Sequence, residues 1–212
     1  MSSRASKTNN SATTPAPASP GSDRELVITR IIDAPRYIAF LRGINLGNRR
    51  LPMSRLKALF EELGFDDVET FIASGNVLFS TKATESGRLE SRIARHLETS
   101  LGYDVDTFVR TVDEVAAIGR AHVFPEDGQE GIRIHVGLFQ QELPPGVARR
   151  LAGLRTAEDE FRVIGREFYW LCRVRTSDSK VWMLPELKAL RLPTSTLRNI
   201  SSIRKLIAKH LV

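Results

Sequence analysis

The chain has 212 residues, 42% of them hydrophobic, which is enough for a packed core and excludes global disorder. Its formal net charge is +6, and nine Lys or Arg stand against two Asp or Glu from Cys172 to the C-terminus. No apolar run approaches the roughly 18 residues of a membrane span. A single cysteine excludes an internal disulfide framework. We therefore expect a soluble cytoplasmic protein with no membrane association.

The first 35 residues differ in composition from the rest. Residues 1–22 are rich in Ser, Thr, Ala, Pro and Asn and cannot bury enough apolar surface to offset the entropy of ordering, so we expect disorder. Residues 24–36 alternate like a strand and resemble the first strand of START-like ligand-binding domains, but they are too few for such a domain. They are either a fusion remnant or a strand at a sheet edge. We therefore assign residues 1–35 to a disordered tail, and the choice between a fusion remnant and an edge strand stays open.

The next stretch predicts a strand, a Gly-rich loop, a helix and a hairpin. The first strand is Tyr37–Leu41, and the loop is 42–50. Pro52 suits a first helical turn, and the apolar residues from Met53 to Leu63 follow helical spacing. Strands at 68–73 and 77–81 then flank a hairpin turn at Ser74-Gly75-Asn76.

Further along the chain the same order of elements appears twice. Helical spacing over Glu85–Leu101 and alternation over Val105–Arg110 complete a β-α-β-β-α-β unit, after which Thr111 and Glu114 predict a capping box. Residues 121–131 form a linker. The second unit contains these expected elements: strand 132–139, helix 147–154, hairpin strands 160–164 and 167–174, helix 180–190 interrupted by Pro185, strand 194–197 and helix 199–211.

A β-α-β-β-α-β order with right-handed crossovers closes as a ferredoxin-like sandwich. The fold class is therefore α+β with two ferredoxin-like halves, residues 36–120 and 131–212, each an antiparallel sheet with helices on one face. The halves show no obvious repeat of residues. Their open sheet faces must be buried, either by packing against each other or by forming one continuous sheet.

One stretch resembles a known family. The run YIAFLRGINLGNRRLPMSRLKALFEELGFDDVETFIASGNVLFST, from residue 37, is similar to the opening of the bacterial domain-of-unknown-function family 1697. The similarity extends over about residues 36–212 and includes Thr196, Arg198 and Asn199. At Ile200 the family usually has an aromatic residue, so a stacking role at that position is in doubt here. The resemblance implies no reaction, because the family has no established one.

The loop after the first strand is the first candidate site. Backbone N–H groups near Gly43 and Gly47, together with Arg42, Arg49 or Arg50, can hold an anion in front of a helix N-terminus. The alternative is a tight structural loop in which Asn45 bonds the backbone and Arg42 forms an ion pair. Ser74 and Asn76 in the hairpin turn can present polar groups beside the loop, or serve the turn alone.

The second candidate site is the junction before the last helix, where Asn199 can cap the helix and Arg198 can bind a carboxylate or phosphate. We expect both sites to converge in a cleft between the halves that binds a small anionic ligand. The candidate ligand-binding residues are Arg42, Gly43, Asn45, Ser74, Asn76, Thr196, Arg198 and Asn199.

Other functions have weaker support. The four histidines lack metal-ligand spacing, so neither a metal nor another cofactor is expected. Nucleic acid could bind without sequence preference through the basic C-terminal region, although that charge can equally be a solvated helix face. A protein-interaction module without chemistry is the third alternative. Catalytic residues and oligomeric state stay unassigned.

Overall fold

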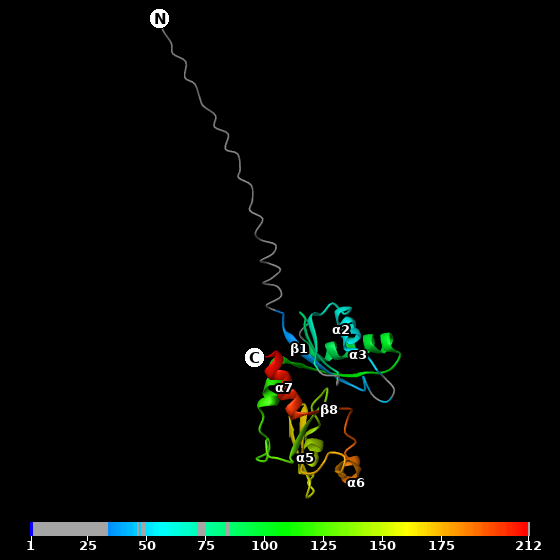
Figure 1. Cartoon of the computed structure of the whole chain (residues 1–212), viewed down its shortest axis with the longest axis vertical. Coiled ribbons are helices and arrows are strands. Elements are labelled where there is room, and N and C mark those ends of the chain that lie inside the picture. The colour runs from blue at the N-terminus through cyan, green and yellow to red at the C-terminus, as the bar shows by residue number, and fades with distance from the viewer. Residues whose placement is uncertain (2–33, 46, 48–49, 72–74, 84, 212) are drawn as a thin grey trace. The chain divides into compact units, whose positions relative to one another are not determined.

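The computed structural model describes Met1 and residues 34–211 except 46, 48–49, 72–74 and 84. The expected tail and most of the START-like strand, which fall on residues 2–33, lie outside the described residues. The chain divides into two units, Met1–Asp33 and Ala34–Val212, and the second contains all of the helices and strands considered below. Figure 1 shows this unit as two sheets with helices around them.

The first half is a ferredoxin-like sandwich. Its four strands pair antiparallel in the order β2-β3-β1-β4, which places the two central strands next to each other although a helix and a strand separate them in the chain. The strands are β1 (Arg36–Arg42), β2 (Asp66–Phe71), β3 (Asn76–Ser80) and β4 (Asp106–Thr111). The helices are α2 (Met53–Glu61), α3 (Ser86–Leu101) and α4 (Val112–Arg120).

The second half repeats this topology, with the antiparallel strand order β6-β7-β5-β8. Its strands are β5 (Arg133–Leu138), β6 (Asp159–Ile164), β7 (Glu167–Cys172) and β8 (Thr196–Asn199). Its helices are α5 (Pro145–Gly153), the 3-10 helix η1 (Val181–Met183), α6 (Pro185–Lys188) and α7 (Ile200–His210). Two ferredoxin-like halves of α+β class are thus confirmed.

The two sheets bury their open faces against each other. Because successive side chains of a strand point to opposite faces, Ile38 and Phe40 enter a central core, while Tyr37 and Leu41 pack beneath α2 and α3. The central core also contains Val136 and residues of α4 and α7, which lie side by side. A third core lies on the other face of the second sheet. Of the two arrangements expected from the sequence, the packed one is correct.

Predictions of local structure are confirmed where a side-chain hydrogen bond fixes the backbone conformation. Thr111 and Glu114 form the expected capping box, in which Glu114 N–H donates to the Thr111 hydroxyl and Thr111 N–H donates to the Glu114 carboxylate. The helix expected over 180–190 is interrupted at Pro185, as the sequence predicted. Pro185 has no N–H and opens α6 as its first residue, so the segment becomes two short helices.

Candidate functional site

Arg198 of the second half reaches into the first half. Its Nη2 donates to the Leu41 carbonyl at 2.8 Å and its Nε to the Asn76 amide oxygen at 2.8 Å. Within its own strand, Nη1 donates to the Thr196 hydroxyl at 2.7 Å and to the Leu197 carbonyl at 3.0 Å. Three of the sequence-predicted residues, Arg198, Thr196 and Asn76, therefore meet at the junction of the halves.

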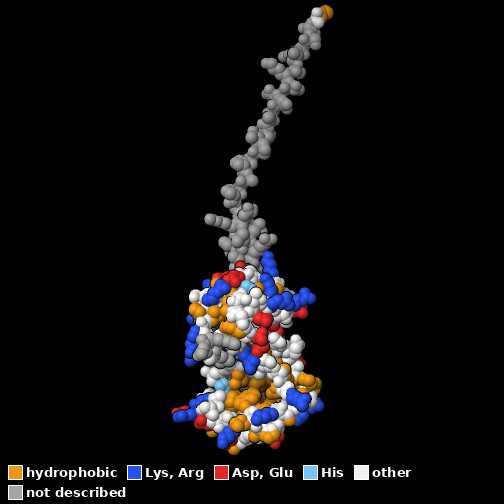
Figure 2. Space-filling view, turned by 90° about the vertical axis from the view of Figure 1, so that its right-hand side faces the viewer, with side chains coloured by type: hydrophobic (Ala, Val, Ile, Leu, Met, Phe, Trp, Pro, Cys, Tyr) orange, Lys and Arg blue, Asp and Glu red, His pale blue; other side chains and the backbone are white. Residues whose placement is uncertain are grey.

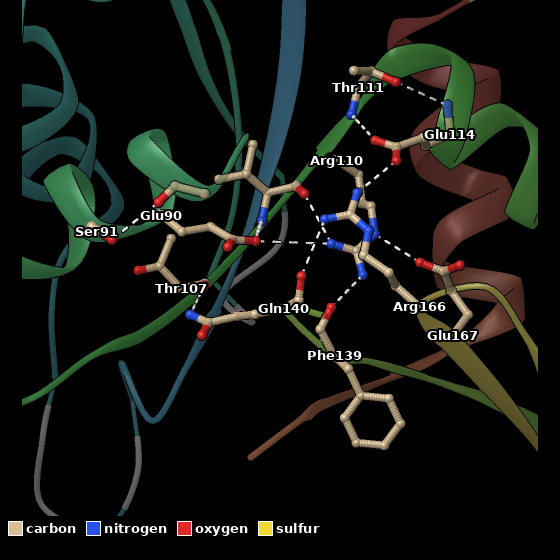
Figure 3. Close-up of polar contacts among 12 residues, drawn as sticks. Glu90, Ser91, Thr107, Arg110, Thr111, Glu114, Phe139, Gln140, Arg166 and Glu167 are labelled. Carbon is tan, nitrogen blue, oxygen red and sulfur yellow. Dashed lines mark hydrogen bonds and ion pairs between the residues drawn. The ribbon is translucent and has the colours of Figure 1, made fainter. Parts of the chain in front are cut away.

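Arg110 of the first half makes the reverse connection, drawn in Figure 3. Its Nη2 donates to the Phe139 carbonyl at 2.6 Å and its Nε to the Glu167 carboxylate at 2.7 Å. Its Nη1 donates to the carbonyl of its own neighbour Val109. The Arg110 side chain is fully buried, and the Glu90 carboxylate lies 3.9 Å away. Each half thus sends one arginine into the other.

The two cross-half arginines, Arg110 and Arg198, occupy equivalent positions. Each lies in the last strand of its half, bonds the carbonyl of the preceding residue, and bonds a carbonyl at the end of the other half's first strand. The residues that supply those carbonyls correspond as well, because Leu41 N–H bonds the Gly75 carbonyl and Phe139 N–H bonds the Arg166 carbonyl. The two halves are therefore related as an internal repeat, and the correspondence includes the contacts of these two arginine side chains.

The two copies differ in the side chain that accepts the hydrogen bond from the arginine Nε. Asn76 begins β3 and pairs with Phe40, and Glu167 begins β7 and pairs with Leu138, so they are counterparts. One carries an amide and the other a carboxylate. The same alignment brings out a short repeat in the sequence, Val-Arg-Thr-Val at 109–112 and Leu-Arg-Asn-Ile at 197–200. Each copy ends a strand and opens a helix.

The two cross-half arginines, Arg198 and Arg110, differ in their electrostatic surroundings. Burial lowers the pKa of Arg198 to about 10, because a charged guanidinium is disfavoured away from water. Beside Arg110, burial raises the pKa of Glu90, although its carboxylate accepts the Val109 N–H and faces a guanidinium. The pKa of Glu114 is lowered: burial opposes the shift, but hydrogen bonds from Thr111 N–H and Arg166 outweigh it.

The other sequence-predicted residues bond elsewhere. Arg42 forms an exposed ion pair with Asp106 at 2.8 Å. Asn45 accepts the Leu51 N–H at 2.8 Å and so holds the loop before α2. Asn199 caps α7, its side chain accepting from the N–H and hydroxyl of Ser201.

Gly43 has φ 81°, the left-handed conformation that glycine favours. Ser74 lies outside the described residues. Ile200, where an aromatic was expected, is buried in the central core.

A hollow of about 570 Å³ opens between the loop and the N-terminus of α2. The described residues that line it are Asn45, Arg50, Leu51, Pro52 and Met53, none of them acidic. Among the described residues, no side chain caps the first turn of α2, and that turn holds no acidic residue. We call this feature the α2 hollow. Its arginine, apolar wall and helix N-terminus are an arrangement that attracts an anion.

Several C-terminal basic residues are engaged within the chain. Arg173 bonds Glu126 at 2.6 Å, and Arg204 forms a two-pronged contact with Asp127. Lys209 lies over the Phe71 ring. Among the described residues, no cluster of three His, Cys, Asp or Glu side chains has an arrangement suited to a metal ion.

Comparison with known proteins gives the family. The model of the family described as protein of unknown function (DUF1697) matches residues 35–169. The chain belongs to the DUF1697 family. No curated protein matches it. The conserved bacterial protein SP0830 from Streptococcus pneumoniae has a similar structure, with a TM-score of 0.66 and 19% identity over 82% of this chain and 99% of that one. At this identity the likeness shows the fold alone.

The sequence did not single out the cross-half residue Arg110, because alternation along a strand accounts for a charged residue as facing solvent. The signal that could have found it is the repeat of Arg110 and Arg198 before two helices.

In the part of this DUF1697 chain that the structure describes, no helix is long and apolar enough to cross a membrane.

Proposed function

We propose that this protein binds a small anionic ligand in the α2 hollow. The observation that carries the proposal is the N-terminus of α2 beside Arg50: no described side chain caps this helix, and its first turn has no acidic residue. The first N–H groups of a helix have no acceptor within it, and the helix dipole favours negative charge there. An anion in the hollow would satisfy those groups and pair with the guanidinium.

The walls of the hollow indicate the class of ligand. Leu51, Pro52 and Met53 provide apolar surface, and Arg50 provides a planar donor that suits a carboxylate or phosphate. The volume of about 570 Å³ falls within the range of small-molecule pockets. The ligand we propose is therefore a carboxylate or phosphate ester with a small apolar body.

The remaining candidate residues would act by holding this site in shape. Asn45 fixes the loop through Leu51 N–H. A Cβ added to Gly75 would meet Ile44 at 2.8 Å, so the hairpin turn packs directly on the loop. Arg198 bonds the Leu41 carbonyl just before the loop. Support for the start of the loop thus comes from the second half.

Isothermal titration calorimetry with inorganic phosphate and with a short-chain aliphatic carboxylate tests the proposal. Arg50→Ala should weaken binding roughly 10- to 100-fold, the equivalent of losing a charge-assisted hydrogen bond of about 1.5–3 kcal/mol. Lys57→Ala is the matched control, since Lys57 lies on the same helix but pairs with Glu61 at 3.7 Å. Equal affinities for both variants, or no binding of either anion, would refute the site.

Nucleic-acid binding through the basic C-terminal region predicts another result. Binding to a phosphate backbone falls steeply with salt because counterions are released. A small anion at one arginine and one helix N-terminus should depend on salt only weakly. A steep salt dependence that Arg50→Ala leaves unchanged would favour the nucleic-acid alternative.

A further inference from the structure

A second cavity, of about 270 Å³, lies in the second half of the chain. It is lined by residues from three stretches: 127–129, 132–134 around the start of β5, and 199–204 at the junction of β8 and α7. No described residue that lines the α2 hollow also lines this cavity, so the two are separate. We call it the α7 cavity.

One arginine that lines the α7 cavity, Arg133, is fixed at one edge of its guanidinium and open at another. Its Nη1 donates to the Gly131 carbonyl at 3.1 Å and to the Val174 carbonyl at 3.2 Å. Among the described residues, neither its Nε nor its Nη2 has a hydrogen-bond acceptor. Nε and Nη2 lie on the edge of the guanidinium that binds two oxygens of one carboxylate or phosphate side by side. The two carbonyls therefore hold the group in place and leave that edge available.

The acidic residue that lines the same cavity, Asp127, does not offset the charge of Arg133. Although Lys and Arg side chains are interspersed with Asp and Glu on the face that Figure 2 shows, no described carboxylate pairs with Arg133. Asp127 accepts two hydrogen bonds from Arg204, which lower the pKa of Asp127, and it also pairs with His122. Burial, and then the nearby charge of Arg133, lower the pKa of His135. The cavity therefore presents a positive charge.

Asn199 supplies a second donor beside Arg133. Its Oδ1 caps α7 by accepting from the N–H and the hydroxyl of Ser201, at 2.8 and 2.7 Å. In the part of the chain that the structure describes, its Nδ2 has no acceptor. Asn199 pairs with His135 across β8 and β5, and Arg133 lies two residues before His135. Such diagonal neighbours share one face of a sheet, roughly 7–8 Å apart, so one small anion can reach both donors.

We propose that the α7 cavity binds a small oxyanion, a carboxylate or a phosphate, between Arg133 and Asn199. Both open side-chain groups are donors, so the ligand supplies the acceptors, and the charge of the guanidinium selects an anion. The cavity is smaller than the about 300–1,000 Å³ of pockets for drug-sized molecules. The ligand is therefore close in size to inorganic phosphate or acetate. This site does not depend on the proposed α2 hollow.

Two-dimensional ¹⁵N–¹H NMR of the full-length protein, titrated with inorganic phosphate and separately with acetate, tests the proposal. We expect saturable shifts of the Asn199 side-chain amide and of the Ser201 backbone amide. Saturation by either anion supports the site, and the anion that saturates at the lower concentration gives the class of ligand. Absence of saturable shifts at these two residues with both anions would overturn the proposal.

Two variants separate the donors from the fold. Asn199→Asp keeps the helix cap, because Asp caps as well as Asn, but places a carboxylate where the amide donor was. Arg133→Gln removes the guanidinium. Each should weaken anion binding at least about tenfold, as the loss of a charge-assisted hydrogen bond does. Arg175→Gln removes an exposed arginine with the same change in charge and should bind as the wild type does. Equal weakening in Arg133→Gln and Arg175→Gln would contradict the site.

The same spectra distinguish the α7 cavity from the α2 hollow. Arg50→Ala should leave the shifts at Asn199 and Ser201 unchanged, and Arg133→Gln should leave those at the first turn of α2 unchanged. Saturable shifts at α2 alone would overturn the α7 site and leave the proposed function standing. Saturable shifts at Asn199 and Ser201 alone would do the reverse.

Discussion

Replacing Arg110 by Met should destabilise the fold much more than replacing Arg42 by Met. The comparison measures how much more a buried contact between the halves contributes to stability than an exposed ion pair does. The Arg110 side chain is fully buried and its Nε lies 2.7 Å from the Glu167 carboxylate. Arg42 makes a nearly equal contact with Asp106, 2.8 Å, but with 53% and 43% of the two side chains exposed. Methionine keeps most of the apolar stem in both variants and removes only the guanidinium.

The expected magnitudes follow from burial. Removing one member of a buried ion pair costs about 3–5 kcal/mol, because the other charge is left without compensation. An exposed pair contributes at most about 1 kcal/mol. For a chain of this size 1 kcal/mol shifts the melting temperature by about 2–4 °C. Arg110→Met should therefore lower it by about 6–20 °C, and Arg42→Met by at most about 4 °C.

Calorimetric melting at several pH values is the assay. Without Arg110, the folded-state pKa of Glu90, already raised by burial, should rise further above its unfolded value. Such groups stabilise the fold below the unfolded pKa, and this contribution is lost as the pH rises. The deficit of Arg110→Met should thus grow from about pH 5 to pH 8. Equal losses in Arg110→Met and Arg42→Met, or a deficit that shrinks as the pH rises, would refute the reasoning.

Three further outcomes are expected. Arg198→Met should lower the urea midpoint more than Arg42→Met does, because the buried Leu41 carbonyl and Asn76 amide lose a donor worth about 1–3 kcal/mol each; a smaller loss would contradict this. Gly137→Ala should destabilise by at least about 1–3 kcal/mol, since its Cβ would lie 1.9 Å from Phe168, whereas Gly146→Ala meets nothing within 4 Å and should be neutral or stabilising in thermal melts. Glu114 has a lowered pKa, so its contribution exists above the unfolded pKa and disappears as the pH falls through the folded value; Glu114→Gln should flatten the decline of stability in acid, and an unchanged slope would exclude this role.

Periodicity and caps were enough to predict most of the fold. The stripe from Met53 and the Thr111 capping box define elements through residues close in sequence, so local physics decides them. In the segment 180–190, Pro185 was enough to predict an interruption of the helix. The packing of Trp182 on Phe168 and Trp170 joins residues far apart in the chain, so no local pattern predicts it.

The candidate site was predictable only in part. Asn45 accepts a backbone N–H within its own loop and Asn199 caps the helix that follows it, and the sequence had left these local roles open for both residues. The meeting of Arg198 with Asn76 joins residues 122 positions apart, and no local pattern contains that information. The reciprocal Arg110 contact depends on how the halves pack, which periodicity does not encode.

Backbone amide shifts recorded by two-dimensional ¹⁵N–¹H NMR during titration with inorganic phosphate and the short-chain carboxylate test the central claim most directly. If the α2 hollow binds the anion, the largest shifts should occur at the first-turn amides of α2, Met53, Ser54 and Arg55, and should saturate. Arg50→Ala should suppress them. Shifts confined to other surfaces, such as the C-terminal basic residues, or shifts that never saturate would contradict the account.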